Sequence, residues 1–199
     1  MRYNRLVITT DELEAKLTGG VETPTLEVKA ACLWSAPLLA KDILAMSNVR
    51  DGGYIIIGVE DATFRRQGIT PEQKASYHLD TMRDQMAKYA DPRVVFTVEF
   101  PRDKNDFEFS VIRVLPFDEV PVICAVENDE LRRGIVYYRN TNAKVESAPV
   151  SNANDMRDIM MTAAQRMMRR LQEAGFTVQE QANAEESTLQ ALLRERQGL

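Results

Sequence analysis

The chain has 199 residues, of which 44% are hydrophobic and 28% charged, a composition typical of a folded globular protein rather than a disordered or fibrous one. Its formal net charge of −5 repels a polyanion, which disfavours a histone-like protein that coats DNA. Contact with nucleic acid therefore requires a local group of basic side chains, and the length favours one compact domain with helical extensions.

The sequence lacks the apolar segments that membrane insertion and secretion require. No apolar run approaches the roughly 20 residues of a membrane-spanning helix, and the start, MRYNRLVITTDELEAKL, does not resemble a signal peptide. We therefore expect a cytoplasmic protein with no membrane contact. The two cysteines, Cys32 and Cys124, lie far apart and outside any CxxC pair, so we expect buried free thiols.

The first half of the chain combines helical and strand patterns. Thr10 as an N-cap, the acids after it and a Gly-Gly stop predict a short first helix. Residues 25–30 (TLEVKA) predict a strand, and the helical spacing of apolar residues over 36–49 predicts a helix that ends in a glycine turn. Residues 54–59 (YIIIGV) are apolar without alternation, which predicts a central strand covered on both faces.

The downstream segments complete the expected sheet. A helix is predicted over 73–89, closed by Pro92. The expected strands are 94–100, 107–115, 120–125 and 135–139, with the first two joined as a hairpin by the polar turn 101–106. These elements predict an α+β (mixed α/β) fold, a mixed sheet with flanking helices and a C-terminal helical extension.

The C-terminal segment is predicted to be helical from residue 151. One apolar stripe, rich in methionine and preceded by Asp155 and Asp158, is typical of a core or partner interface; its members are Met156, Ile159, Met160, Ala163, Ala164, Met167 and Leu171. Residues 184–196 are polar and helix-prone, either a solvated tail or a helix that orders in an oligomer. The expected organisation is an N-terminal helix over 1–20, a domain over 20–150 and a helical extension over 151–199 for packing or oligomerisation.

Two common catalytic patterns are absent. His78 is the only histidine and has no nucleophile motif near it, which disfavours a serine or cysteine hydrolase. The glycines near residues 52–58 form neither GxxxxGK[ST] nor GxGxxG, which disfavours an ATPase.

The carboxylates carry more information. Glu22 and Glu27 are five residues apart, and a bend at Pro24 can bring both to one site. Glu60 and Asp61 follow the central strand, at the strand end where open sheets usually place ligands. Such a group of acids suits Mg²⁺ or Mn²⁺, which prefer oxygen ligands and can polarise a phosphodiester; solvated surface acids are the plain alternative.

Lys29 shares strand parity with Glu27 and is expected on the same face. There it either forms a cross-strand ion pair or contacts a phosphate and the negative charge that develops on it during cleavage.

Taken together, the residues resemble the AlbA_2 domain of Schlafen proteins and their bacterial relatives. The resemblance rests on Glu22-x4-Glu27-Val28-Lys29 and on the segment DGGYIIIGVED over 51–61, and it continues through LPFDEVPVI (115–123) and VYYRNTN (136–142). It covers roughly residues 20–160. Val28 stands where the family usually has phenylalanine.

The resemblance implies a function and a site. Vertebrate Schlafen proteins of this kind are RNA endonucleases that use three acids, and the matching positions here are Glu22, Glu27 and Asp61, the implied catalytic residues and metal ligands, with Lys29 beside them. Their active region joins two related lobes, whereas this chain has one, so a homodimer through the methionine-rich helix over 155–171 is expected to restore the groove.

Basic clusters are the candidate contacts to a nucleic-acid backbone, with solvated surface as the alternative. They comprise Arg65, Arg66, Arg132, Arg133, Arg139 and Lys144, and Arg166, Arg169 and Arg170 further on. Two hypotheses follow. The first is a Mg²⁺- or Mn²⁺-dependent endoribonuclease acting on structured RNA such as tRNA, as a toxin or anti-phage effector. The second is a non-catalytic nucleic-acid-binding regulatory module, or a subunit of a larger defence complex that docks a partner protein through the C-terminal helices.

Overall fold

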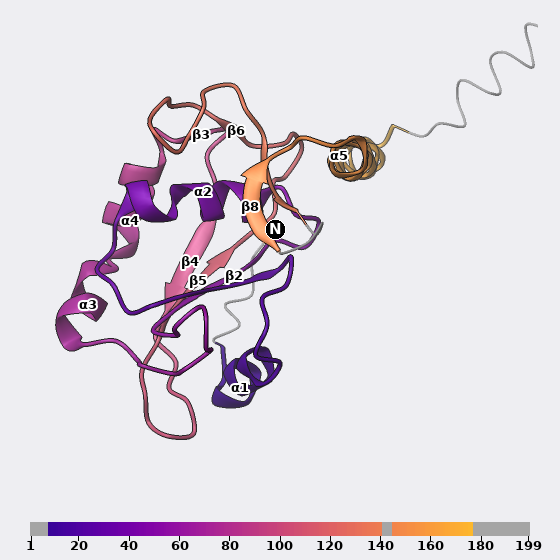
Figure 1. Cartoon of the computed structure of the whole chain (residues 1–199). Coiled ribbons are helices and arrows are strands. Elements are labelled where there is room, and N and C mark those ends of the chain that lie inside the picture. Colours follow the sequence, from indigo (N-terminus) through magenta and orange to yellow (C-terminus); the bar gives the residue numbers. More distant parts are fainter. Residues whose placement is uncertain (1–7, 141–144, 177–199) are drawn as a thin grey trace, which may run out of the picture.

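A computed structural model describes residues 8–140 and 145–176 of the chain (Figure 1). The elements in chain order are α1 (Thr10–Thr18), β1 (Leu26–Lys29), α2 (Ala36–Ser47), β2 (Gly53–Ile57), α3 (Pro71–Ser76), α4 (Leu79–Met86), β3 (Ala90–Asp91), β4 (Phe96–Glu99), β5 (Ser110–Val114), β6 (Ile123–Cys124), β7 (Tyr137–Asn140), β8 (Glu146–Pro149) and α5 (Ala153–Glu173). The fold is α+β, as predicted.

The main sheet has the strand order β1-β2-β5-β4. β1 runs parallel to β2, while the β2–β5 and β4–β5 pairs are antiparallel. The predicted central position of β2 and the hairpin of β4 with β5 are therefore confirmed. Two small ladders, β3 with β6 and β7 with β8, complete the described strands.

Each face of the main sheet packs against a helix. On one face, Ile55 and Ile57 of β2 join the core beneath α2. On the other face, Ile56 packs with Leu13 and Leu17 of α1, which covers β1 and β2 from the opposite side (Figure 1). A strand buried on both faces explains why the apolar run of β2 does not alternate.

The first helix begins one residue earlier than predicted. Thr9, not Thr10, is the N-cap: its hydroxyl accepts from the Glu12 N–H, and the Glu12 carboxylate accepts from the Thr9 N–H. This reciprocal capping box satisfies two backbone donors that the first turn would otherwise leave unpaired.

The helix predicted over 73–89 is instead two short helices, α3 and α4, separated at Tyr77 and His78. The Tyr77 side chain is buried, and its hydroxyl donates to the Cys32 carbonyl oxygen at 3.1 Å. Turning this ring into the core breaks the helix, so a tertiary contact prevails over local helical spacing. The polar strand β8 was not predicted either; it forms only because β7 offers its backbone groups to pair with.

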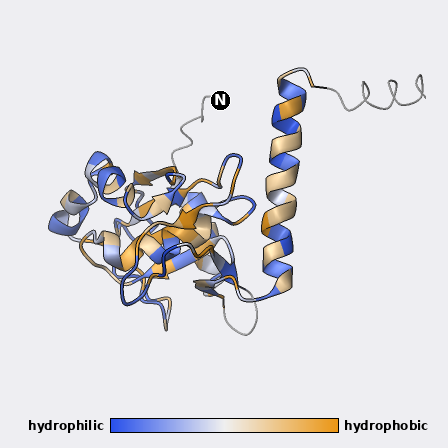
Figure 2. Cartoon of the chain, turned by 90° about the horizontal axis from the view of Figure 1, so that it is seen from above, coloured by the Kyte–Doolittle hydropathy of each residue, from blue (hydrophilic) through white to orange (hydrophobic). Residues whose placement is uncertain are grey.

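α5 is helical as expected, but its methionine stripe is not core. Ile159 and Thr162 are its buried residues, whereas Met160 and Met167 are exposed. Figure 2 shows α5 standing beside the body rather than embedded in it.

The polar segment 184–196 lies outside the described residues. No helix in the described part of the chain is long and apolar enough to cross a membrane.

Candidate functional site

Strand β1 presents its side chains alternately to the two faces of the sheet. Leu26 and Val28 pack on the α1 face. Glu27 and Lys29 lie on the opposite face, where the Lys29 ammonium is 2.5 Å from Glu27 Oε1 and 3.2 Å from Asp42 Oδ2 of α2. The shared parity of Glu27 and Lys29 thus creates a contact between them, as strand geometry requires.

A tight turn before β1 brings Glu22 back to the strand. Thr23 and Leu26 exchange backbone hydrogen bonds around Pro24, which folds the approach segment over. The Glu22 carboxylate can then accept from the Val28 N–H at 3.0 Å. Glu22 and Glu27 therefore lie together despite their odd spacing in the sequence.

Arg139 of β7 reaches into the same place and is almost fully buried, with 1% of its surface exposed. Its guanidinium donates to Glu27 Oε2 at 2.5 Å and lies 3.9 Å from Glu22 Oε2. It also donates to Ser147 Oγ and to the carbonyl oxygens of Thr23 and Leu26. Arg139 therefore ties β7 and β8 to the start of β1.

Together, Glu22, Glu27, Lys29, Asp42 and Arg139 form what we call the charged cluster. It holds three carboxyl groups and two cations in a largely buried setting, where each charge depends on its neighbours. Asp42 was not singled out from the sequence. The available signal was an acid beside the apolar stripe of α2, a position where an unpaired carboxylate is costly.

The cluster shifts the protonation of its members. Burial raises the pKa of Glu22 to about 7, with the nearby Glu27 adding to the effect and the Val28 N–H opposing it. Although burial alone lowers it, the pKa of Lys29 is raised above its ordinary value because Asp42 and Glu27 stabilise the ammonium. Glu22 thus changes charge close to neutral pH while Lys29 stays cationic.

Asp61 is not gathered with the other two predicted ligands. It is an exposed residue in the turn that follows β2. Among the described residues, no three Asp, Glu, His or Cys side chains stand close enough together to hold a metal ion. Of the predicted trio, the structure brings together Glu22 and Glu27 and leaves Asp61 apart.

The cluster fits a divalent cation only in part. Mg²⁺ is often held by one or two carboxylates together with water and substrate phosphate, and Glu22 and Glu27 supply that chemistry. In this structure, however, Lys29 and Arg139 occupy both oxygens of Glu27. Binding a metal there requires one of these cations to move, so the Mg²⁺ or Mn²⁺ site remains a prediction.

The predicted basic contacts differ in how free their side chains are. Arg65, Arg132 and Arg133 are exposed, and Arg65 lies 3.4 Å from the Glu60 carboxylate. Arg66 is bound to Glu14 and Asp103 at 2.8 and 2.9 Å, an arrangement that lowers the pKa of Glu14 to about 2. Arg139 is buried in the charged cluster, and Lys144 lies outside the described residues.

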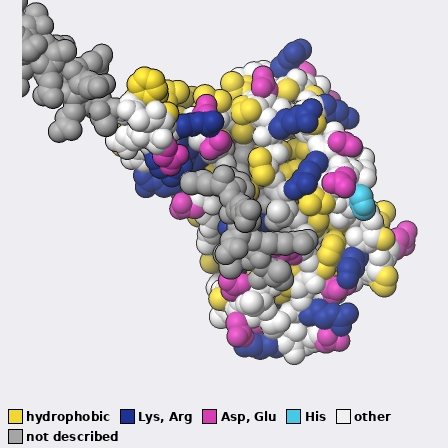
Figure 3. All heavy atoms as spheres, turned by 180° about the vertical axis from the view of Figure 1, so that it is seen from behind, with side chains coloured by type: hydrophobic (Ala, Val, Ile, Leu, Met, Phe, Trp, Pro, Cys, Tyr) yellow, Lys and Arg dark blue, Asp and Glu magenta, His cyan; other side chains and the backbone are white. Residues whose placement is uncertain are grey.

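Figure 3 shows one face of the molecule, on which basic and acidic side chains are interspersed. No broad surface of a single sign appears in that view. Any backbone contact on that face would therefore be made by a few arginines rather than by an extended positive field.

Comparisons with known proteins add a family and two similar folds. The family model described as Schlafen, AlbA_2 matches residues 22–148, a range that contains the whole charged cluster. No curated protein matches the sequence.

Two solved structures are similar at low identity. A crystal structure of a protein from Corynebacterium diphtheriae aligns with a TM-score of 0.49 and 16% identity over 74% of this chain, and the match spans only 27% of that protein. A solution structure from Nitrosomonas europaea, the N-terminal domain of a protein related to the ATP-dependent DNA helicase RecG, aligns with a TM-score of 0.48 and 17% identity over 73% of this chain and 96% of that one.

Proposed function

The chain belongs to the Schlafen AlbA_2 family, and from this premise we propose that it acts on nucleic acid. In its finer form, the proposal is a Mg²⁺- or Mn²⁺-dependent endoribonuclease that cleaves structured RNA such as tRNA, with the charged cluster as its reaction centre. The same proposal assigns it to the cytoplasm, as an anti-phage effector or a toxin.

The observation that carries the proposal is the pairing of Glu22 with Glu27. A carboxyl group whose pKa is about 7 is well matched to taking up or releasing a proton at neutral pH. Burial and the neighbouring carboxylate are the usual means by which catalytic acids and bases are tuned. Glu22 is therefore assigned the role of accepting the proton of the attacking hydroxyl group.

The two cations have different roles. The Lys29 side chain is 31% exposed and can contact a phosphate oxygen as negative charge develops there. Arg139 is buried and holds Glu27 in place, so it is a positioning residue. A divalent cation held by Glu27 with water and the substrate phosphate would supply Lewis-acid activation of the phosphate; the sequence also predicts Glu22 and Asp61 as ligands, and Glu22 can act as the base only where it does not bind the metal.

Cleavage of purified tRNA, followed on denaturing gels, tests the proposal. The wild-type chain should cut tRNA with Mg²⁺ or Mn²⁺ present, and EDTA should stop the reaction. Glu22→Gln should lower the rate by about 100-fold or more, because a general base is lost while the hydrogen bond from the Val28 N–H is retained. The wild-type rate should rise with pH as Glu22 loses its proton, with an inflection at or below about 7 because a bound cation lowers the pKa of a neighbouring carboxyl group.

Glu72→Gln is the matched control, since Glu72 is an exposed acid of α3 distant in sequence from the cluster. It should cleave like the wild type. A wild-type chain that is inert on RNA and DNA with both metals, or a Glu22→Gln chain as active as the control, would falsify the nuclease proposal.

A second function is favoured by the two contacts that Glu27 makes. Glu27 already has both oxygens engaged by Lys29 and Arg139, as expected if the acids serve structure rather than chemistry. The chain would then be a non-catalytic nucleic-acid-binding module, alone or within a larger defence complex. This alternative predicts salt-sensitive binding without turnover, weakened by replacing Arg132 and Arg133 with Gln but not by Asp61→Ala.

A homodimer formed through α5 also belongs to the proposal. The exposed methionines offer an apolar stripe, with Asp155 and Asp158 near the start of the helix and Arg169 and Arg170 near its end. Two antiparallel copies would bring unlike charges together, as an isologous contact allows. A different partner protein docking on the same stripe is the alternative.

A further inference from the structure

A pocket of about 310 Å³ opens on the α1 face of the main sheet, away from the charged cluster. Ile8, Glu12, Lys16, Tyr54, Glu99 and Arg113 line it. Tyr54 packs against the core on the α1 side of the sheet, whereas Glu27 and Lys29 project to the α2 side. The pocket is therefore separate from the site proposed above.

Three elements of the fold supply the aromatic ring and the two cations of the pocket. Tyr54 of β2 and Arg113 of β5 are register partners, so their side chains project from the same place on the sheet. From α1, Lys16 lays its ammonium 3.7 Å from the centre of the Tyr54 ring. The Arg113 guanidinium carbon lies 5.9 Å from the same ring. Two cations thus flank one aromatic ring.

These cations are not neutralised by ion pairs in the described part of the chain, where neither Lys16 nor Arg113 forms a salt bridge. Burial lowers the pKa of Lys16; Glu12 opposes this shift and the nearby Arg113 adds to it. Like charges held close together at a partly buried site favour an anion that contacts both of them.

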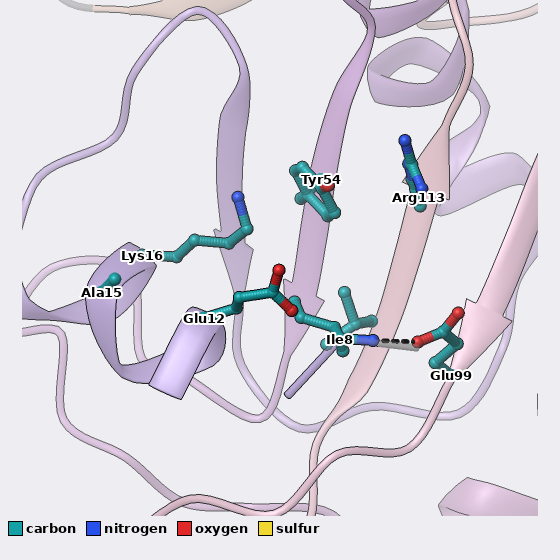
Figure 4. Close-up of a pocket in the computed structure, with 8 residues that line it drawn as sticks. Ile8, Glu12, Ala15, Lys16, Tyr54, Glu99 and Arg113 are labelled. Atoms are coloured by element: carbon teal, nitrogen blue, oxygen red, sulfur yellow. Dashed lines mark hydrogen bonds between the residues drawn. The ribbon is translucent and has the colours of Figure 1, made fainter. Parts of the chain in front are cut away.

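The two acids of the pocket differ in their place: Glu12 is near enough to interact electrostatically with both Lys16 and Arg113, whereas Glu99 lies beside Ile8. Figure 4 shows the Tyr54 ring between Lys16 and Arg113, the Glu12 carboxylate below that ring, and Glu99 beside Ile8. One oxygen of Glu12 accepts from Thr9, and one oxygen of Glu99 accepts from the Ile8 N–H at 2.6 Å. Within the described residues, the second oxygen of each carboxylate has no hydrogen bond.

We propose that this pocket binds a nucleoside monophosphate, with the phosphate in contact with Lys16 and Arg113 at the edge of the Tyr54 ring and the base donating N–H groups to Glu12 and Glu99. The volume lies at the lower end of the range for small-molecule sites, which suits one nucleotide rather than two. Ile8 and Val111 provide apolar walls for the base. A bare phosphate would contact the two cations only and leave the acids without donors.

Isothermal titration of the full chain tests this inference. AMP, GMP, CMP and UMP are each titrated, together with adenosine, guanosine and inorganic phosphate. We expect saturable binding of at least one monophosphate, with its nucleoside and inorganic phosphate each about tenfold weaker or more, because each lacks the contacts that one half of the monophosphate makes.

The variants locate the site. Arg113→Gln and Lys16→Gln should each weaken the monophosphate by about tenfold. Arg93→Gln, an exposed arginine outside the pocket, should bind like the wild type. Thermal melting shows whether each variant folds. If Arg113→Gln does not fold, Lys16→Gln, on the helix surface, serves as the test.

The inference is wrong if no monophosphate binds at about 1 mM, if inorganic phosphate binds equally well, or if both pocket variants bind like Arg93→Gln. Glu22→Gln removes the proposed general base on the opposite face and should leave monophosphate binding unchanged. Failure of the nuclease proposal and failure of this one are therefore distinguishable.

Discussion

At the scale of the residue, Glu22 makes the stability of the protein depend on pH. Its pKa is about 7 in the folded state, against an ordinary value of 4.5. Between these values the folded chain holds a proton that the unfolded chain has lost, so stability falls as pH rises through this window and levels off above it. The physical reason is that burying the ionised Glu22 carboxylate costs free energy.

Glu22→Gln should remove this dependence. Relative to the wild type, the variant should gain about 1 kcal/mol of unfolding free energy at high pH, after allowing for solvent screening, and little at low pH. Urea denaturation of both chains at about pH 5 and about pH 8 measures the difference. If the unfolding free energies of the variant and the wild type differ by the same amount at both pH values, the pKa of Glu22 is not raised in the folded state.

At the scale of the element, the end of α2 is joined to the second half of the chain through Asn48. Its buried amide donates to the carbonyl oxygens of Leu44, Val122 and Tyr137, and its Oδ1 accepts from the Val122 N–H at 2.8 Å. One side chain therefore satisfies backbone groups from α2, from the segment before β6 and from β7. These contacts orient the strand that carries Arg139.

Asn48→Ala should lower the unfolding free energy by about 2–4 kcal/mol, because it leaves several buried backbone groups without partners. Chemical denaturation measures this loss. Asn105→Ala, at an exposed loop position, is the matched control and should change stability by less than about 0.5 kcal/mol. Equal effects of the two substitutions would show that the Asn48 network contributes little.

At the scale of the whole molecule, α5 stands beside the body and is held mainly by polar contacts. Arg166 donates to the carbonyl oxygens of Phe117 and Arg50, and Arg170 pairs with Asp118. Met160 and Met167 remain 63% and 50% exposed, a large apolar surface for a helix that has one fully buried apolar anchor, Ile159. An exposed stripe of this kind is typical of an interaction surface.

The double variant Met160→Glu, Met167→Glu should convert a dimeric wild type to a monomer, because it places charges in the apolar seam of the proposed interface. Light scattering after size-exclusion chromatography measures the mass. Gln172→Glu, an exposed charge substitution on the same helix, should stay dimeric. A wild type that is monomeric at about 100 μM contradicts the proposed dimer.

Local patterns in the sequence determined the main elements. Apolar spacing located α2, β2 and α5, and the polar turn located the β4–β5 hairpin. The break at Pro24 correctly anticipated that Glu22 and Glu27 meet, because proline limits the backbone within a few residues. Strand parity likewise placed Lys29 beside Glu27. These features depend on neighbours along the chain.

Only the tertiary structure showed which side chains from distant parts of the chain contact one another. Glu27 meets Arg139 across 112 positions, Lys29 meets Asp42 on a helix, and Lys16, Tyr54 and Arg113 gather from three segments. It also buried Tyr77, which broke a helix, and left the methionines of α5 exposed. Burial and charge compensation act between residues that are distant in the chain, so the local periodicity of the sequence cannot identify these partners.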